Sequence, residues 1–449
     1  MVLKSYFFDI DRLRRMNEDQ LRRYQDRCLR HMVFFAYTVP LYHDTYKDAG
    51  VHPSDITGLK DLKKLPTVSK EDFKRYYPNG IISSTSKKEH LIEVSTSGTT
   101  GKSLSLFVDL YDIVMGLFGY IRAIKEYDIN WRKTRMTIIG DFASHTVESG
   151  YIAKGLQPRF NQSSWFQNIQ WLNTNDPPEK LIKEINAFKP EFIGGYVGML
   201  GHLALLKEQG YGADISPKVI ASTGSVIDPL LKSFIEDTFH AQVFESYGST
   251  ESGPIAFQCP NGSYHVMSDL VHLEFLKDGD EVETGKAGQL VVTKLYGRGT
   301  PIIRYDAIND IIAPKRNQCS CGMTGELIEK IYGRNDLALF LPNGRVLLPS
   351  SFSEIYSKIL YGLKTTMMKE TKIIQYSENE IEIQVVLDEE KQDAGPSATE
   401  VLFSLQKGFE EKVGPDVSVQ VKAVPQIDKG GARIVSHVDR STYKIREYI

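Results

Sequence analysis

The sequence predicts an α/β protein, with a large N-terminal layered α/β domain that includes a β-subdomain and a small, mobile C-terminal α+β domain. In the first half, short apolar segments alternate with helical patterns, which is typical of a parallel sheet covered by helices. From about residue 264 a two-residue alternation begins, which favours antiparallel strands. A chain of 449 residues is also longer than one ordinary core requires, so we expect more than one domain.

The elements of the first half follow from apolar periodicity and from helix breakers. We expect one amphipathic helix over 11–37 that Pro40 ends, and strands over 92–94, 104–108 and 136–139. Further strands are expected over 191–193, 218–222 and 242–245, with helices over 178–188, 198–209 and 228–239. This alternation predicts the parallel part of the sheet.

The second half is expected to begin with antiparallel strands over 272–275 and 289–295. A smaller unit follows, with a hairpin over 371–377 and 380–387, a helix over 397–412 and a strand over 417–423. We therefore predict an N-terminal domain over 1–331 and a C-terminal lid domain over 332–449, which is an ordinary size for a small domain.

Composition excludes several classes of protein. The formal net charge is −3, so no electrostatic bias toward nucleic acid or an anionic membrane is expected. No apolar run approaches the roughly twenty residues that span a bilayer, and the first ten residues lack a signal-peptide pattern. Four cysteines in so long a chain do not form a disulfide framework. We expect a cytoplasmic protein without nucleic-acid or membrane partners.

The most informative segment is the run Ser-Thr-Ser-Gly-Thr-Thr-Gly-Lys over 95–102. Its glycines allow the backbone to approach an anion, its hydroxyls donate hydrogen bonds, and Lys102 adds a positive charge for a polyphosphate. It is not a Walker A loop, because only two residues separate Gly98 from Gly101. The alternative is a Ser/Thr-rich surface turn, although ordinary turns need only one or two special residues.

With this loop and four later motifs, the chain resembles the adenylate-forming superfamily, and within it the phenylacetate–CoA ligase branch with its capsule-biosynthesis-like members. The later motifs occur in the expected order: Tyr-Gly-Ser-Thr-Glu over 247–251, Gly-Gln-Leu-Val-Val-Thr over 288–293, Arg-Tyr-Asp with a following Asp over 304–310, and Gly-Arg-Asn-Asp over 333–336. The resemblance covers most of the chain.

The resemblance implies a role for each matching residue. Tyr247 would stack on adenine, Glu251 would hold Mg²⁺, and Asp310 would accept hydrogen bonds from the ribose hydroxyls. Without the family, Glu251 is readily interpreted as a surface acid in a turn and Asp310 as a turn residue. Catalytic roles fall to Thr100 and Lys102, with Lys429 as a third candidate. The remaining nucleotide-binding candidates are Ser97, Gly98, Thr99, Gly101, Gly224, Ser225, Gly248, Ser249, Thr250 and Arg334.

The reaction implied is ATP-dependent activation of a carboxylic acid through an acyl-adenylate, followed by transfer to coenzyme A. The loop donors, Lys102 and Mg²⁺ would act by positioning and electrostatic stabilisation. Rotation of the small domain about Asp336 would exchange the two half-reactions. Because family members are often dimers, a homodimer is also an expectation.

The chain departs from the family pattern near its C-terminus. There the family usually carries a catalytic lysine, whereas simple alignment places Gly431 at that position. Lys429 or Arg433 could substitute, but lysine and arginine are not equivalent at such sites. The departure favours a rival hypothesis, in which the acyl group passes to an amine, a hydroxyl or a carrier protein. A nucleotide-binding scaffold without catalysis is a third hypothesis, against which Lys102, Glu251 and Asp310 argue.

Two further groups of residues carry chemistry. Cys259, His265, Cys319 and Cys321 offer three thiolates and an imidazole, which is a known structural zinc set, although buried thiols and an unrelated histidine are the alternative. By resemblance, the acid should lie between the helix after Gly-Gly-Tyr over 194–196 and the turn over 223–225. Tyr196 could line this pocket. His145 could contact a phosphate or an acceptor, or could be structural.

Overall fold

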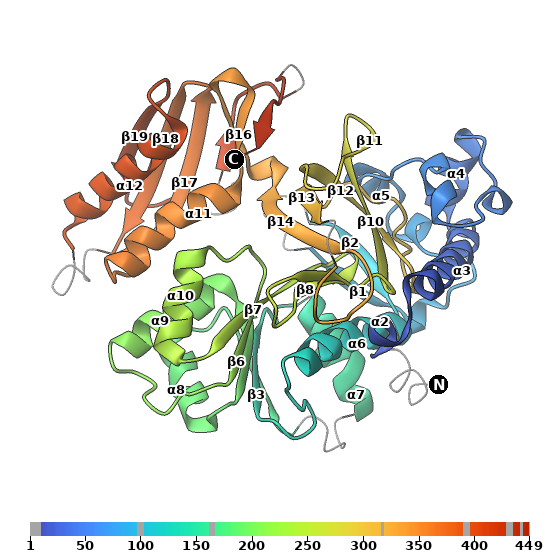
Figure 1. Cartoon of the computed structure of the whole chain (residues 1–449), viewed down its shortest axis with the longest axis horizontal. Coiled ribbons are helices and arrows are strands. Elements are labelled where there is room, and N and C mark those ends of the chain that lie inside the picture. Colours follow the sequence, from blue (N-terminus) through green and yellow to red (C-terminus); the bar gives the residue numbers. More distant parts are fainter. Residues whose placement is uncertain are drawn as a thin grey trace.

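A mixed sheet of twelve strands organises most of the molecule. The computed structural model describes residues 10–96, 103–144, 146–160, 167–315, 318–388, 396–427, 434–440 and 443–448. The strand order of the sheet is β11-β10-β12-β13-β14-β9-β8-β7-β6-β5-β3-β4. Figure 1 shows this sheet across the lower and right parts of the molecule, with the C-terminal elements set apart in orange and red. The predicted α/β class is confirmed.

The parallel part of the sheet is formed where strands and helices alternate. Its strands are β3 (Met136–Gly140), β4 (Ile169–Asn173), β5 (Phe192–Tyr196), β6 (Val219–Thr223) and β7 (Gln242–Ser249), with β4 at the edge. The helices α8 (Pro178–Phe188), α9 (Val197–Glu208) and α10 (Pro229–Phe239) connect them. Their apolar faces and the sheet share one hydrophobic core. In α9, eight of twelve residues are buried, as expected for a helix covered on more than one side.

The antiparallel part continues the same sheet. Its strands are β8 (Gly253–Gln258), β9 (Tyr264–Val266), β10 (Val271–Lys277), β11 (Asp280–Glu281), β12 (Gly288–Lys294), β13 (Asp310–Lys315) and β14 (Leu327–Arg334). The predicted pair around 272–275 and 289–295 is confirmed, since β10 and β12 run antiparallel with His272 opposite Thr293. A separate hairpin consists of β1 (Ile92–Ser95) and β2 (Ser105–Val108).

Helices at the N-terminal end cover this second half. They are α2 (Arg12–Arg15), α3 (Glu18–Ala36), α4 (Pro40–Asp48), α5 (Lys70–Tyr76), α6 (Leu110–Glu126) and α7 (Gln157–Phe160). Short helical turns are η1 (Pro53–Asp55), η2 (Leu59–Lys64), η3 (Asn79–Ile81), η4 (Lys88–His90) and η5 (Ser149–Leu156). They pack with the antiparallel strands into the largest core of the molecule.

The prediction of one helix over 11–37 was wrong. The chain breaks between α2 and α3, where the Asn17 side chain caps α3 by accepting a hydrogen bond from the Gln20 backbone N–H at 2.9 Å, and the Gln20 side-chain oxygen accepts one from the Asn17 backbone N–H at 3.0 Å. An asparagine followed by two acids favours a helix start, which the apolar periodicity concealed. Pro40 does not end this helix either. It occupies the first position of α4, where a missing N–H costs nothing.

The C-terminal elements have a core of their own. They are β15 (Leu339–Leu341), β16 (Arg345–Leu347), β17 (Met368–Ser377), β18 (Glu380–Leu387), β19 (Ser418–Ala423), β20 (Ile434–Ser436) and β21 (Glu447–Tyr448), with α11 (Pro349–Ser357), α12 (Ala398–Val413), η7 (Asn335–Leu337), η8 (Pro342–Gly344) and η9 (Lys358–Gly362). The predicted hairpin is the antiparallel pair β17–β18. Strand β14 runs across the boundary predicted at 331/332, and that boundary stays a prediction.

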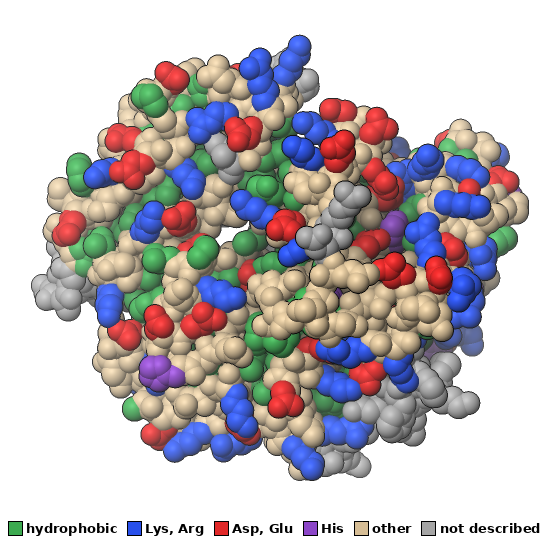
Figure 2. Space-filling model, in the orientation of Figure 1, with side chains coloured by type: hydrophobic (Ala, Val, Ile, Leu, Met, Phe, Trp, Pro, Cys, Tyr) green, Lys and Arg blue, Asp and Glu red, His purple; other side chains and the backbone are tan. Residues whose placement is uncertain are grey.

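The C-terminal elements dock on the helices of the parallel half. The Ser357 hydroxyl at the end of α11 donates a short hydrogen bond to Asp228, the residue that caps α10. Beyond η9, Lys364 pairs with Glu208 at 2.6 Å. On the face drawn in Figure 2, acidic and basic side chains are mixed over both parts. None of the helices among the described residues is both long enough and apolar enough to cross a membrane.

Candidate functional site

The predicted phosphate loop joins the strands of the β1–β2 hairpin. At its base, the Leu104 backbone N–H donates to the Thr96 hydroxyl at 2.9 Å, and the Thr96 N–H donates to the Leu104 carbonyl at 2.9 Å. The Ser95 and Ser105 hydroxyls lie 2.8 Å apart across the hairpin. These bonds fix the two ends of the loop. The predicted residues Ser97, Gly98, Thr99, Thr100, Gly101 and Lys102 themselves lie outside the described residues.

Buried polar contacts attach this hairpin to the segment before β13. The Phe107 backbone N–H, in β2, donates to the Thr300 hydroxyl at 3.0 Å. The Thr300 backbone N–H donates to the Phe107 carbonyl at 2.7 Å. Nearby, Asp112 of α6 pairs with Lys294 at 2.8 Å and accepts the Gly299 N–H at 3.0 Å. Burial alone raises the pKa of Asp112, but Lys294 outweighs it and holds that pKa below the usual value. The hairpin is therefore attached through Phe107 and Thr300, and a buried charged pair fixes the following helix α6 to strand β12.

Tyr247 and Asp310 meet where β7 ends and β13 begins. The Tyr247 hydroxyl donates a short hydrogen bond to the Asp310 carboxylate. Asp310 is only 8% exposed, and burial raises its pKa to about 6, against the opposite effects of the Tyr247 hydrogen bond and of the Arg334 charge. The two residues that resemblance assigns to adenine and ribose are thus in direct contact, although 63 residues separate them.

Glu251 lies in the tight turn between β7 and β8. The Tyr305 hydroxyl donates to its carboxylate at 3.2 Å. The turn is closed by Ser249, whose hydroxyl accepts the Ser252 N–H at 3.1 Å, and Thr250 stands between them. A side chain at Gly248 would come within 2.7 Å of the Gly253 carbonyl, so the turn requires glycine there. Glu251 is half-buried and oriented by Tyr305, unlike an ordinary surface acid.

Arg334 closes the site from the end of β14. It stands opposite Asp310 in the β13–β14 pair, and its guanidinium binds Asp336 at 2.8 Å and 2.6 Å. Lys70, the first residue of α5, was missed by the sequence analysis. It is half-buried, burial lowers its pKa, and the charges of both Glu251 and Arg334 act on it. A helix-capping pattern at Ser69 locates α5 but gives no sign of these distant neighbours.

Tyr196 and Gly224 form a further part of the site at the ends of β5 and β6. Gly224 has a positive φ of 86°, and a Cβ there would lie 2.3 Å from the Tyr196 ring. The Tyr196 hydroxyl donates a short hydrogen bond to Glu148, which precedes η5. Ser225, the next residue after Gly224, is exposed. The sequence analysis proposed Tyr196 for this region but missed Glu148.

The four predicted zinc ligands come together between β8, β9 and the segment before β14. Their ligand atoms all lie within 4.8 Å of one another. The Cys259 and Cys319 sulfurs are 3.6 Å apart, and the Cys321 sulfur is 3.2 Å from Nε2 of His265. Burial lowers the pKa of His265 to about 4, so its imidazole is neutral at pH 7. This is a donor set and a spacing that a tetrahedral metal requires.

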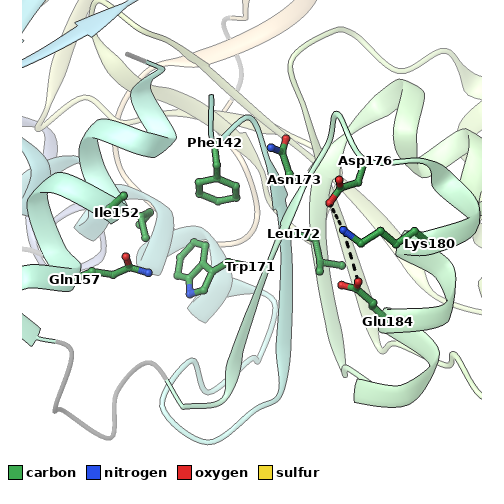
Figure 3. A pocket seen from close by; sticks show the side chains of 10 residues that line it. Phe142, Ile152, Gln157, Trp171, Leu172, Asn173, Asp176, Lys180 and Glu184 are labelled. Atoms are coloured by element: carbon green, nitrogen blue, oxygen red, sulfur yellow. Dashed lines mark hydrogen bonds and ion pairs between the residues drawn. The ribbon is translucent and has the colours of Figure 1, made fainter. Parts of the chain in front are cut away.

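A pocket of about 410 Å³ lies between η5, β4 and α8. Figure 3 shows Phe142 and Trp171 facing its interior, with centroids 6.1 Å apart. Its charged groups are already paired, since Lys180 contacts Asp176 at 3.0 Å and Glu184 at 3.9 Å. The pocket adjoins the end of β3 but contains none of the motif residues.

Comparison with known proteins agrees with this geometry. No family model matches the chain. A Staphylococcus aureus protein, CapK, is 23% identical over 341 residues, which are 74% of this chain and 72% of that protein. The phenylacetate–coenzyme A ligases of Pseudomonas putida and Aromatoleum evansii are 27% and 26% identical, with 78% of each chain covered. The chain is related to the phenylacetate–coenzyme A ligase branch of the adenylate-forming superfamily.

The fold is that of a solved adenylate-forming enzyme. The crystal structure of 2-hydroxyisobutyryl-CoA ligase in the postadenylation state, in complex with 2-HIB-AMP, matches with a TM-score of 0.71 at 18% identity. The match covers 97% of this chain and 90% of that one. O-succinylbenzoate coenzyme A synthetase from Bacillus subtilis, in complex with AMP, matches with a TM-score of 0.50 at 16% identity. It covers 75% of this chain and 66% of that one.

Of the residues that the resemblance assigns to nucleotide and metal binding, four that the structure describes lie close together. Tyr247, Glu251, Asp310 and Arg334 converge where β7 and β14 end and β13 begins. Lys429, Gly431 and Arg433 lie outside the described residues, as does His145. The expectations placed on those positions remain predictions.

Proposed function

We propose that this protein is an ATP-dependent, AMP-forming ligase that converts a carboxylic acid to its acyl-adenylate and transfers the acyl group to coenzyme A. The observation that supports it best is the contact between Tyr247 and Asp310, beside Glu251 and Arg334. The relatives named phenylacetate–coenzyme A ligase carry the same function in their names. The acid and coenzyme A are the small-molecule partners of this proposal.

The proposed reaction has two steps, in which the residues of the site have separate roles. In the first step an acid oxygen attacks the α-phosphorus of ATP, and the bond to pyrophosphate breaks. In the second step a thiolate attacks the acyl carbon, and AMP leaves. Thr100 and Lys102 would stabilise charge on the phosphate oxygens, while Asp310 fixes the ribose. Glu251 would hold Mg²⁺, a hard cation that neutralises phosphate charge and prefers carboxylate oxygen.

A pyrophosphate-release assay over a panel of carboxylic acids tests the first step. Glu251→Ala is expected to lose release, because the metal loses its carboxylate ligand. Glu179→Ala is the matched control, since this acid is exposed on α8, far along the chain from the motifs. Full activity of Glu251→Ala would refute the magnesium role. Thioester formation with coenzyme A, measured separately, tests the second step.

An acceptor other than coenzyme A is the alternative. The likeness to CapK and the presence of Gly431 where the family carries lysine both favour it. In this version an amine, a hydroxyl or a carrier protein attacks the acyl-adenylate, within surface-polysaccharide or cofactor biosynthesis. Hydroxylamine intercepts the adenylate in either case. Hydroxamate without any thioester would favour the alternative over the coenzyme A ligase.

We also propose that Cys259, His265, Cys319 and Cys321 hold a structural Zn²⁺. Zinc–sulfur bonds of ~2.3 Å place tetrahedral sulfur ligands about 3.8 Å apart, close to the 3.6 Å between Cys259 and Cys319. Four protein ligands leave no open coordination position, so the role is structural rather than catalytic. A cytoplasmic location and a homodimer complete the proposal. Cell fractionation and light scattering of the purified chain test them.

A further inference from the structure

The parallel strands end at one edge of the sheet, next to the nucleotide-binding motifs. Gly140 ends β3, Tyr196 ends β5, and Thr223 ends β6, and these strands are neighbours in parallel register with β7, which carries Tyr247. In open α/β sheets, ligands bind in the crevice outside the carboxyl ends of the strands. The side chains that stand at this edge, beside Tyr247, are therefore the ones that an activated acid would meet.

Tyr196 spans this edge in a fixed orientation. Its ring covers Gly224 so closely that a Cβ there would lie 2.3 Å from Cδ1 and 2.8 Å from Cε1. No other residue type fits beneath the ring without moving it. The hydroxyl at the end of this ring donates its hydrogen to Oε1 of Glu148. Tyr196 thus holds the Glu148 carboxylate in place.

Glu148 lies over the end of β3. Its Cγ is 3.1 Å from the position that a Cβ would take at Gly140, and the Phe142 ring is 3.3 Å from the same position. The carboxylate is half-buried between this ring and the Tyr196 hydroxyl. Within the part of the chain that the structure describes, no lysine or arginine forms an ion pair with Glu148.

Among the described residues, a second carboxylate, Asp141, lies near the Tyr196 hydroxyl that binds Glu148. Besides burial, the charges of Glu148 and Asp141 both raise the pKa of the Tyr196 hydroxyl, so both carboxylates lie near it. Asp141 is occupied by hydrogen bonds from the Ala143 N–H and the Asn175 amide, each at 3.0 Å. A half-buried carboxylate that receives one neutral hydrogen bond retains capacity for a cationic donor.

We propose that Glu148, positioned by Tyr196, recognises an ammonium group on the acid, so that the substrate is an amino-substituted carboxylic acid. This inference rests on the proposed function, because it describes the acyl side of that reaction. An unsubstituted hydrocarbon acid would enclose the Glu148 carboxylate without an opposite charge, which costs free energy. An ammonium group donates hydrogen bonds and also supplies the opposite charge, so it forms an ion pair with the Glu148 carboxylate that a neutral hydroxyl does not form. Glu148 would thus determine specificity.

The test compares acids that differ only in one amino group, using the purified full chain and ATP. Suitable pairs are β-alanine with propionate, 4-aminobutyrate with butyrate, and 4-(aminomethyl)benzoate with 4-methylbenzoate. Pyrophosphate release gives kcat and KM for each acid. For the amino-substituted acid with the highest kcat/KM, we expect this constant to exceed that of its unsubstituted counterpart by at least about tenfold, which corresponds to ~1.4 kcal/mol. Equal rates, or a preference for the neutral acids, would overturn the inference.

Substitutions then assign the preference to the residue. Glu148→Gln is expected to raise KM for the amino acid at least about tenfold, while the neutral acid keeps its KM, because only the ammonium loses a counter-charge. Tyr196→Phe keeps the ring over Gly224 and should raise the same KM by less than Glu148→Gln does. Glu179→Gln makes the same charge change on exposed α8 and should alter neither constant.

The outcomes separate this inference from the proposed function. If Glu148→Gln affects amino and neutral acids equally while melting like the wild type, the recognition role is wrong although the ligase activity stands. If Glu148→Gln is too unstable to assay, Glu148→Asp keeps the charge but shortens its reach, and it should still raise KM for the amino acid alone. Absence of pyrophosphate release with every acid would instead overturn the proposed function, and this inference with it.

Discussion

The contact between Tyr247 and Asp310 predicts how nucleoside binding depends on pH. On the proposed function, the ionised Asp310 carboxylate accepts both ribose hydroxyls, an arrangement that protonation weakens, and burial raises the pKa of Asp310 to about 6 in the free protein. The dissociation constant should therefore be constant above pH 6 and should rise about tenfold per pH unit below it, until the pH reaches the lower pKa of the complex. The sign follows because protonation removes the binding-competent carboxylate.

Tyr247→Phe is the perturbation that tests this account. It keeps the ring for adenine but removes the hydroxyl that donates to Asp310. A hydrogen bond to a charged group contributes about 1.5–3 kcal/mol, and one pKa unit corresponds to about 1.4 kcal/mol, so the pKa of Asp310 should rise by about 1–2 units. The break in the pH profile should move from about 6 to about 7–8.

Adenosine is the suitable ligand, because it presents adenine and ribose without phosphates that titrate in this range. Its dissociation constant is measured by calorimetry between pH 5 and pH 9 for the wild type, Tyr247→Phe and Asp310→Asn. Asp310→Asn should weaken binding at least about tenfold and abolish the break, since the amide does not titrate. A break that stays at the same pH in Tyr247→Phe, or that persists in Asp310→Asn, would refute the reasoning.

Three further predictions concern stability, metal and domain contact. Glu274→Ala leaves buried Arg304 without the carboxylate that binds it at 2.8 Å and 3.0 Å, so urea unfolding should show a loss of about 3–5 kcal/mol; a change below ~1 kcal/mol would contradict this. The wild type should purify with about one zinc per chain, measured by mass spectrometry, and Cys319→Ser with much less, whereas equal contents would exclude the site. Ser357→Ala removes the hydroxyl that donates to Asp228, a hydrogen bond to a charged group that contributes about 1.5–3 kcal/mol. Limited proteolysis between α10 and α11 should therefore accelerate about tenfold or more. An unchanged rate would show that this bond does not hold the C-terminal part.

The fold was predictable where its signals are local. The hairpin over β17 and β18 and the helix α10 follow from periodicity and adjacent turn residues, and the structure reproduces them within a few residues. The helix α6 was missed, although Asp109 and Asp112 form a capping box at its start. Its apolar residues recur at helical spacing and ten of its residues are buried, so the local signal for this helix is present in the sequence.

The site was predictable only as far as its residues belong to motifs. Resemblance named Tyr247 and Asp310, which the structure places in contact. Lys70 and Glu148 belong to no motif, and their neighbours are brought to them by the sheet, so a single sequence carries no sign of their place. The Cys/His cluster was predicted from residue type alone, because three cysteines and a histidine form an unusual donor set in a chain with four cysteines, and the structure brings these four side chains together.

Arg304 shows why a motif residue need not touch the nucleotide. Its φ is +48°, a left-handed conformation that costs a non-glycine residue roughly 1–2 kcal/mol. The buried guanidinium offsets this cost by binding both oxygens of Glu274. The same conformation sets the direction of the next residue, Tyr305, whose hydroxyl meets Glu251. Arg304 therefore acts through the backbone: it stores local strain in the core so that a tyrosine can orient the proposed magnesium ligand.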